Sequence, residues 1–311
     1  MKNYPAIPHH FLIVAPPYQV RSGGVMVLHD LCDAINRCGH RASIAFIHDG
    51  SAEKQDFKYA YSNNKGLYHP DGQYFKLDLA SIDGQVADVL DTGTVIYPDL
   101  ISGNPLGARR VVRFILNKNT DSHGNDYVLT FSEVYCDHYN FSLPKMFLDP
   151  NINADGALHW SKRSLSLTYI GKGQGFENCF RIPGSILVER DWPRDKEQLG
   201  LLLRQCKFFF TWDCVSATNY DAALCGAVPI LLHDKQIPRE QINCMEFGGF
   251  PAVAFRFNDF CEVVVGDIDA TVEKSIDASL NDMMRNIAWL ESSWQARVGQ
   301  FLNNYILFMC L

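Results

Sequence analysis

The chain has 311 residues and a formal net charge of −7 at pH 7. Hydrophobic residues make up 47% of it and charged residues 20%, a composition that excludes intrinsic disorder and, at this length, predicts two domains of about 150 residues each. The acidic balance argues against a nucleic-acid-binding protein, because phosphate neutralisation needs a dense Lys/Arg surface.

No segment reaches the roughly 20 apolar residues of a transmembrane helix, and residues 1–10 lack the apolar stretch of a secretory signal. We therefore expect a cytoplasmic protein. The ten cysteines form no CxxC pair, and several fall inside apolar segments, as Cys206, Cys214 and Cys225 do. They are typical of small buried hydrophobes in a reducing compartment. The histidines show no metal-binding spacing, so no metal cofactor is expected.

The first half alternates between apolar runs and helical periodicity. Residues 11–15 predict a strand, residues 25–38 carry apolar residues at helical spacing before Gly39, and residues 41–47 alternate into a second strand. This βαβ unit predicts a parallel sheet. A short helix and three more strands are expected at residues 86–90, 94–98, 111–116 and 127–131. Residues 54–83 predict strands and loops at a sheet edge.

The second half restarts this alternation after a linker at residues 149–151. Strands are expected at residues 164–170, 182–188, 207–211, 228–232 and 251–257. Helices are expected at residues 196–206 and 219–225, and residues 267–311 are expected to be mostly helical. The sequence therefore predicts an α/β fold with two Rossmann-like domains, residues 1–150 and 151–311.

Two acidic residues, Asp213 and Asp221, surround the turn between a strand and a helix of the second half. The run 207–211 is apolar and aromatic, as a buried parallel strand is, so Asp213 leaves its carboxyl end and Asp221 belongs to the next helix. Ligands bind at this edge of open α/β sheets, and helix N-termini there favour phosphate. The alternative is a pair of capping or salt-bridging acids.

This block resembles the donor-binding signature of GT-B glycosyltransferases, in which two acidic residues separated by seven others precede a small-residue helix, a Gly and a Pro. The pair here is Asp-x7-Asp where Glu-x7-Glu is usual, and two residues separate Gly226 from Pro229 where one is more common. The resemblance implies that Asp221 holds the ribose of the donor nucleotide and that Asp213 lies against the transferred sugar.

A second resemblance covers residues 13–40, where a strand, a Pro-containing loop, the pair Gly23-Gly24 and a helix ending in Gly-His follow one another as in many GT-B enzymes. The two glycines let a ligand approach the backbone, and their amides begin a helix. The alternative is a plain glycine turn. The loop holds Pro16, Pro17 and Arg21 where a nicotinamide-binding GxGxxG motif needs glycines.

Two further groups are expected at the donor phosphates. Gly171, Lys172 and Gly173 follow the first strand of the second half, and they offer amides and a point charge to a diphosphate; a solvated loop lysine is the alternative. Between the two aspartates, Ser216, Ala217 and Thr218 are placed to cap the helix, to hold a phosphate, or to do both.

The acceptor candidates are Arg21, Asp99 and Asn104. The last two follow the strand at 94–98, in a stretch that resembles the Tyr-Pro-Glu and Gly-Asn-Pro elements of some bacterial surface-polysaccharide transferases. A connection made rigid by proline is the alternative reading of this loop.

Taken together, the resemblance implies a GT-B enzyme like those of glycosyltransferase family 4, with the two domains facing across a cleft and the last helix packing back on the first domain. It implies transfer of a sugar from a nucleotide-sugar donor to a saccharide or lipid-linked acceptor, in cell-surface polysaccharide synthesis. The reaction is expected to retain anomeric configuration and to need no metal, with Asp213 and Lys172 as catalytic candidates.

Three alternatives remain open at this point. The scaffold also suits a non-catalytic module that binds nucleotide sugars or carbohydrate, or a sugar-nucleotide epimerase. The apolar C-terminal segment, residues 301–311, suits either packing in the core or peripheral association with the inner face of a membrane.

Overall fold

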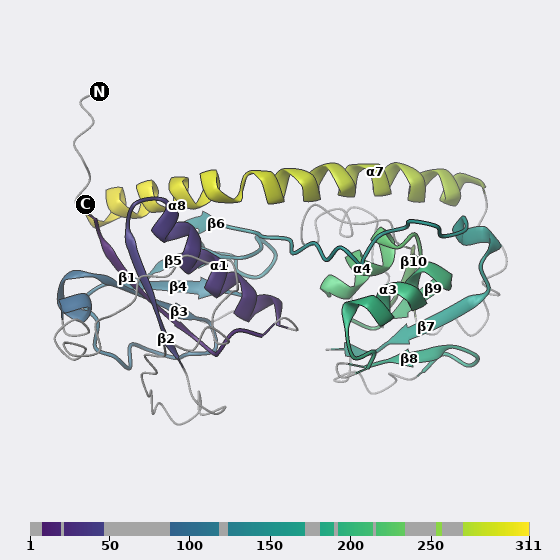
Figure 1. Cartoon of the computed structure of the whole chain (residues 1–311). Helices are drawn as coiled ribbons and strands as arrows, with labels where there is room; N and C mark the ends of the chain where they lie inside the picture. The colour runs from purple at the N-terminus through teal and green to yellow at the C-terminus, as the bar shows by residue number, and fades with distance from the viewer. Residues whose placement is uncertain are drawn as a thin grey trace. The chain divides into compact units, whose positions relative to one another are not determined.

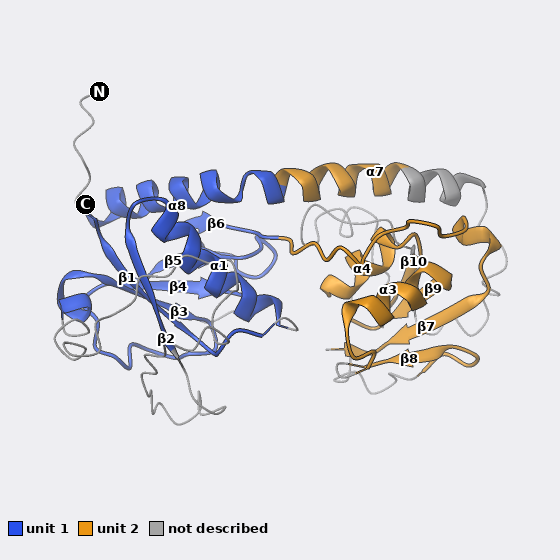
Figure 2. Ribbon diagram, viewed as in Figure 1, with its two compact units in different colours: residues 1–145, 290–311 blue, residues 146–289 orange. Residues whose placement is uncertain are grey.

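The computed structural model describes residues 8–19, 22–46, 88–117, 124–171, 181–189, 192–213, 216–233, 253–256 and 270–310. The chain divides into two compact units (Figure 2), unit 1 with residues 1–145 and 290–311, and unit 2 with residues 146–289. The sequence places the boundary at residue 150 and assigns the C-terminal segment to the second domain, with the last helix returning to the first.

Unit 1 contains a six-stranded parallel sheet in the order β2-β1-β3-β4-β5-β6 (Figure 1). Its strands are β1 (His10–Ala15), β2 (Arg41–Phe46), β3 (Thr94–Pro98), β4 (Val111–Ile115), β5 (Tyr127–Thr130) and β6 (Phe141–Ser142). The first five confirm the strands expected from the sequence. The periodicity did not indicate β6, because two residues are too few to show a pattern.

The strands of unit 1 are mostly apolar because both faces of the sheet are covered. Every residue of β3 is buried, and so is every residue of β1 after His10. On one face, Leu12 and Val14 of β1 and Tyr97 of β3 pack with Ile101 from the connection to β4. This connection therefore covers the sheet where a crossover helix commonly does.

Helix α1 (Gly23–Arg37) begins two residues before the sequence predicted. Ser22 is its N-cap, and the Ser22 hydroxyl accepts a hydrogen bond from the Val25 amide at 3.4 Å. Gly23 and Gly24 therefore lie inside the first turn, where their poor helix propensity had pointed to a turn. The helix ends before Gly39, whose φ of 86° lies in the left-handed region that glycine adopts most easily.

The C-terminal segment forms two helices, α7 (Ala270–Ser292) and α8 (Trp294–Met309). Helix α8 packs in unit 1 against α1 and the sheet, with Phe301 and Tyr305 fully buried. The Tyr305 hydroxyl lies 2.8 Å from Thr94 Oγ1 of β3, and the Tyr305 ring makes an edge contact with Tyr127 of β5. The expected return of the last helix to the first domain is confirmed. No helix in the described part of the chain combines the length and apolarity that a bilayer span needs.

Unit 2 contains a five-stranded parallel sheet in the order β11-β10-β9-β7-β8. Its strands are β7 (Leu165–Tyr169), β8 (Ile186–Val188), β9 (Cys206–Thr211), β10 (Val228–His233) and β11 (Val253–Arg256). Its described helices are α3 (Lys196–Gln205), α4 (Ala217–Leu224) and α7 up to residue 289, with a 3-10 turn η4 at Trp160–Lys162. Cys206 and Cys225 are buried in its core, as the sequence predicted.

One expected strand is shorter than predicted. The sequence indicated residues 182–188, whereas the structure forms β8 only from Ile186. Before it, the Thr168 hydroxyl of β7 lies 2.6 Å from Ser185 Oγ and accepts from the Ile182 amide at 3.2 Å. These buried side-chain bonds hold residues 182–185 as a turn in place of a strand ladder. The elements expected at residues 54–83 lie outside the described residues.

Candidate functional site

In each sheet there is one point where strands that follow one another in the chain lie on opposite sides of the first strand. In unit 2, β8 and β9 lie on opposite sides of β7; in unit 1, β2 and β3 lie on opposite sides of β1. Ligands of open parallel sheets bind outside the carboxyl ends of the strands at such a switch point. Gly171 and Asp213 follow β7 and β9 at the switch point of unit 2, so two of the predicted donor residues lie where this rule expects a ligand.

The Asp213 main chain is held by buried hydrogen bonds. Its amide donates to Thr211 Oγ1 at 3.1 Å, and its carbonyl oxygen accepts from Thr211 Oγ1 at 3.1 Å and from Asn219 Nδ2 at 2.9 Å. Thr211 ends β9 and Asn219 lies in α4, and both are fully buried. The turn from strand to helix is thereby bound to both elements that it joins, and it holds Asp213 at the sheet edge.

Gly171 lies directly against the Asp213 side chain. A β-carbon at Gly171 would be 2.6 Å from Asp213 Oδ2 and 2.6 Å from Cε1 of Tyr169, the last residue of β7. The Gly171 φ of 52° is also one that side-chain-bearing residues rarely adopt. Glycine is therefore required for the close approach of the carboxylate to the backbone that follows β7.

Helix α4 begins four residues after Asp213. Ser216 is its N-cap, and the Ser216 hydroxyl accepts from the Thr218 amide at 3.2 Å. Ser216 and Thr218 are half-buried and Ala217 is exposed. The predicted cap is confirmed, and it explains why the helix starts before residue 219. The first turn presents amide groups and the positive end of the helix dipole, both of which favour an anion.

Asp221 lies in the second turn of α4 and forms an ion pair with Lys196, the first residue of α3. The Asp221 side chain is 6% exposed and the Lys196 side chain 40%. Burial raises the pKa of Asp221 above its usual value, while Lys196 acts in the opposite direction and Asp149 adds to the rise. The salt-bridging alternative for this acid is thus present in the structure, and direct contact with a donor ribose stays a prediction.

In unit 1, the predicted residues at the carboxyl edge share a neighbour. A β-carbon at Gly24 would lie 3.6 Å from Cδ1 of Leu116, which follows β4, whereas one at Gly23 would meet nothing within 4 Å. The Leu116 amide donates to Asp99 Oδ1 at 3.3 Å, and the Asp99 amide donates to the Phe114 carbonyl at 3.0 Å. The structure therefore brings Gly24 and Asp99 to one edge of this sheet.

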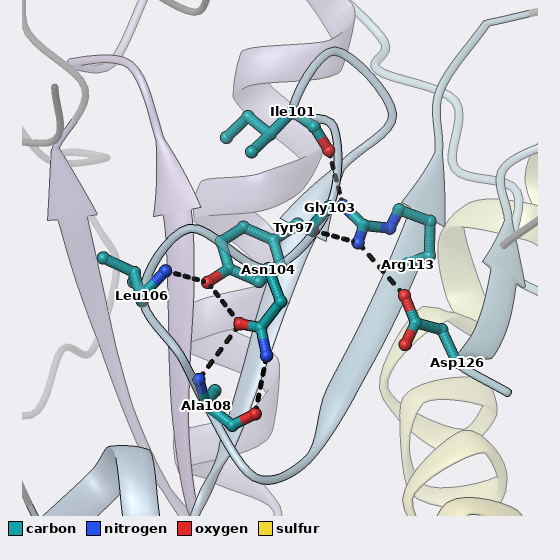
Figure 3. A network of polar contacts seen from close by, with 8 residues as sticks. All are labelled: Tyr97, Ile101, Gly103, Asn104, Leu106, Ala108, Arg113 and Asp126. Carbon is teal, nitrogen blue, oxygen red and sulfur yellow. Dashed lines mark hydrogen bonds and ion pairs between the residues drawn. The ribbon is translucent and has the colours of Figure 1, made fainter. Parts of the chain in front are cut away.

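Asn104 is engaged within its own loop (Figure 3). Its side-chain oxygen accepts from the Tyr97 hydroxyl at 3.1 Å and from the Ala108 amide at 3.0 Å, and its amide group donates to the Ala108 carbonyl at 2.7 Å. Buried Arg113 of β4 donates to the carbonyls of Ile101 and Gly103 in the same connection, and it pairs with Asp126 at 3.0 Å. These contacts give Asn104 a role in folding its own loop, in agreement with the alternative that this stretch is a rigid connection.

Three predicted site residues, Arg21, Lys172 and Gly173, lie outside the described residues. Conversely, sequence reasoning missed Thr211, Asn219 and Lys196. A Thr two residues before an acid at a strand end, followed by an Asn in the next helix, is a weak signal for Thr211 and Asn219; nothing local indicates that Lys196 meets Asp221. Within the described ranges, no three His, Cys, Asp or Glu residues are grouped to hold a metal ion.

No protein-family model matches the sequence, and the comparison with curated proteins found no match. Among solved structures, a glycosyltransferase from Rickettsia africae is similar with a TM-score of 0.50 and 9% identity, over 97% of this chain and 99% of that chain. The catalytic domain of starch synthase IV from Arabidopsis thaliana, bound to ADP and acarbose, is similar with a TM-score of 0.44 and 12% identity, over 98% of this chain and 100% of that chain. The first of these likenesses shows the fold: the chain has the fold of GT-B glycosyltransferases.

Proposed function

We propose that this chain is a glycosyltransferase that moves a sugar from a nucleotide-sugar donor, bound by unit 2, to a saccharide or lipid-linked acceptor, bound by unit 1. One observation carries the proposal. At the switch point of the second sheet, the Asp213 carboxylate lies against Gly171, and the capped N-terminus of α4 follows Asp213 in the chain after three residues. The same edge thus joins a group suited to sugar hydroxyls with amides suited to phosphate.

In this proposal the first turn of α4 binds the donor diphosphate. Its amides and helix dipole stabilise the negative charge that develops on the leaving group, the task that a divalent cation performs in metal-dependent transferases. Lys172 is assigned to the same diphosphate, by its place after β7 and Gly171. Asp213 accepts a hydrogen bond from the transferred sugar. These assignments make the reaction independent of a metal ion.

The transfer breaks the bond between the anomeric carbon and the diphosphate oxygen and forms a bond from that carbon to an acceptor hydroxyl oxygen. We assign the acceptor proton to the leaving phosphate oxygen on the same face of the sugar, so the anomeric configuration is retained and no separate base is required. This stereochemistry rests on the resemblance of the Asp213 to Asp221 block to retaining enzymes. The role in surface-polysaccharide synthesis rests on the resemblance at residues 97–105, where Asp99 is the acceptor candidate at the sheet edge.

The proposal is tested by incubating the purified protein with a panel of nucleotide sugars, with and without saccharide acceptors. Thermal shift detects binding, because a ligand that binds the native state stabilises it. Product analysis then separates the functions. A transferase hydrolyses the donor slowly or transfers its sugar, an epimerase converts the donor sugar, and a binding module leaves the donor unchanged.

The Asp213→Asn variant is expected to lower turnover about 100-fold with a smaller change in donor affinity, because a charge at the reacting sugar acts mainly in the transition state. The measurements are donor turnover and the Kd of the donor. Asp155→Asn is the matched control, since this acid is exposed and lies in the same unit. Wild-type turnover in the Asp213→Asn protein would remove Asp213 from the reaction.

A further inference from the structure

In the ion pair between Lys196 and Asp221, the lysine is more accessible to a ligand than the acid, although the resemblance assigns the ligand contact to the acid. The Asp221 side chain is 6% exposed, while the Lys196 side chain is 40% exposed. A ligand that approaches α4 from solvent therefore reaches the ammonium group before it reaches the carboxylate. Lys196 forms no other hydrogen bond or ion pair with the described residues.

The pair lies within reach of a nucleotide held at α4. Helices α3 and α4 contact each other, and each begins where the chain leaves the carboxyl edge of the sheet. Asp221 comes five positions after the Ser216 cap, which is about 7.5 Å along the helix axis at 1.5 Å per residue. A diphosphate at the first turn of α4 therefore leaves its ribose near the second turn, where Lys196 meets Asp221.

The ammonium group suits this position chemically. It has three N–H donors and gives one of them to Asp221, which leaves two for hydroxyl oxygens of a ligand. The buried carboxylate holds the ammonium in place, so less side-chain entropy is lost when a ligand binds. Asp221 itself offers little exposed oxygen to a hydroxyl group.

We propose that Lys196, anchored by Asp221, donates hydrogen bonds to the ribose hydroxyls of the donor nucleotide, and that Asp221 acts through Lys196 as a positioning residue. The inference rests on the proposed function, because it requires a nucleotide at this edge of unit 2. It assigns the ribose contact to α3, where the resemblance had assigned it to α4.

The test measures the Kd of UDP, ADP and GDP, and of their 2′-deoxy forms, by isothermal titration calorimetry. Wild type is expected to prefer the ribose form. Lys196→Met retains the apolar stem and removes the donors, so it is expected to weaken binding of the ribose form about tenfold and to abolish the preference. Lys207→Met is the matched control, because Lys207 lies at the amino end of β9 and contacts the Phe208 ring.

A second variant separates the two residues and guards against misfolding. Lys196→Met leaves the buried Asp221 without its partner, so the double variant Lys196→Met/Asp221→Asn, which removes both charges, is measured beside it together with Asp221→Asn alone. The proposal expects the double variant to match Lys196→Met, and Asp221→Asn to lose only part of the affinity.

Each remaining outcome overturns one identifiable statement. Loss of ribose preference in Asp221→Asn, with preference kept in Lys196→Met, would assign the contact to Asp221 directly. A wild-type protein that binds the nucleotides without any ribose preference would also overturn the inference and leave the proposed function standing. A wild-type protein that binds neither these nucleotides nor any nucleotide sugar of the panel would remove the proposed function.

Discussion

Gly171 shows how one residue decides the geometry of the candidate donor site. Its φ of 52° and the 2.6 Å between its β-carbon position and Asp213 Oδ2 are two separate reasons for glycine. The first is a property of the backbone alone, and the second depends on the carboxylate beside it. The sequence named both Gly171 and Asp213 as donor residues but contained no sign that they touch, because they follow different strands.

Gly171→Ala is expected to reduce both stability and donor binding. The left-handed conformation costs a residue with a β-carbon about 1–2 kcal/mol, and here the new methyl group also displaces the Asp213 carboxylate. Urea unfolding measures the free energy, and calorimetry with the donor measures the affinity.

Gly184→Ala is the control for that substitution. Gly184 also has a positive φ, 79°, but a β-carbon there would meet nothing within 4 Å. It should lose the backbone contribution alone, with donor affinity unchanged. Equal losses of donor affinity in the two variants would show that the contact between Gly171 and Asp213 is unimportant.

Among the elements of unit 2, the ends of α3 and α4 are joined by one buried side chain. Arg163 follows the η4 turn, and its Nη1 donates to the carbonyls of Leu203 and Cys206 at the end of α3 and to that of Cys225 at the end of α4. The last carbonyls of a helix have no partner within the helix, and a cation also complements the negative end of its dipole. Arg163 therefore fixes the amino edge of the sheet, opposite the candidate site.

Arg163→Met is expected to lower the free energy of unfolding by at least about 2 kcal/mol, because several buried carbonyls lose their donor. Arg204→Met is the comparison, since Arg204 donates to the carbonyls of Asn151 and Asn153 near the protein surface. Urea unfolding of both variants measures the difference. A loss for Arg163→Met no larger than for Arg204→Met would contradict the role given to the buried guanidinium.

Within unit 1, residues near the beginning and near the end of the chain are bound to the same residue of β3. His9 Nε2 lies 2.8 Å from Thr94 Oγ1, and the same hydroxyl lies 2.8 Å from the Tyr305 hydroxyl of α8. Next to it, His10 Nε2 lies 3.0 Å from Ser43 Oγ. The residue before β1 and the last helix are thus both bound to β3 by uncharged hydrogen bonds, and the first residue of β1 is bound to β2 in the same way.

These two histidines predict a loss of stability in acid. Burial, with Arg110 and His40 nearby, lowers the pKa of His9 to about 4; burial, with Arg41 and His9 nearby, lowers that of His10 to about 4. Between the unfolded value of 6.5 and about 4, the unfolded chain binds protons that the folded chain does not. The free energy of unfolding should therefore fall as the pH is lowered through this window.

Urea unfolding at a series of pH values tests this expectation. A His9→Gln/His10→Gln variant should show a shallower fall below about pH 6.5, because glutamine keeps a hydrogen-bonding group and does not titrate there. His138→Gln changes an exposed histidine and should keep the wild-type slope. An unchanged slope in the double variant would mean that other groups carry the acid dependence.

Local sequence patterns were sufficient for most of the secondary structure and for part of the site. Apolar runs such as the one that becomes β9 indicate strands buried on both faces, and a residue that follows such a run must lie at the carboxyl edge of the sheet. The position of Asp213 therefore followed from its neighbours in the chain, as did the Ser216 cap. Helix α1 was misplaced by two residues because the glycines after Ser22 have poor helix propensity.

Contacts between distant segments were decided by folding alone. Lys196 and Asp221 are 25 residues apart, and Thr94 and Tyr305 are 211 apart, so no periodicity links them. Whether Asp221 faces solvent or the lysine that begins α3 depends on how α3 and α4 pack, and whether Asn104 is available to a ligand depends on how its loop folds on itself. Composition and spacing specify which elements form, whereas side-chain packing between elements specifies which polar groups remain for a ligand.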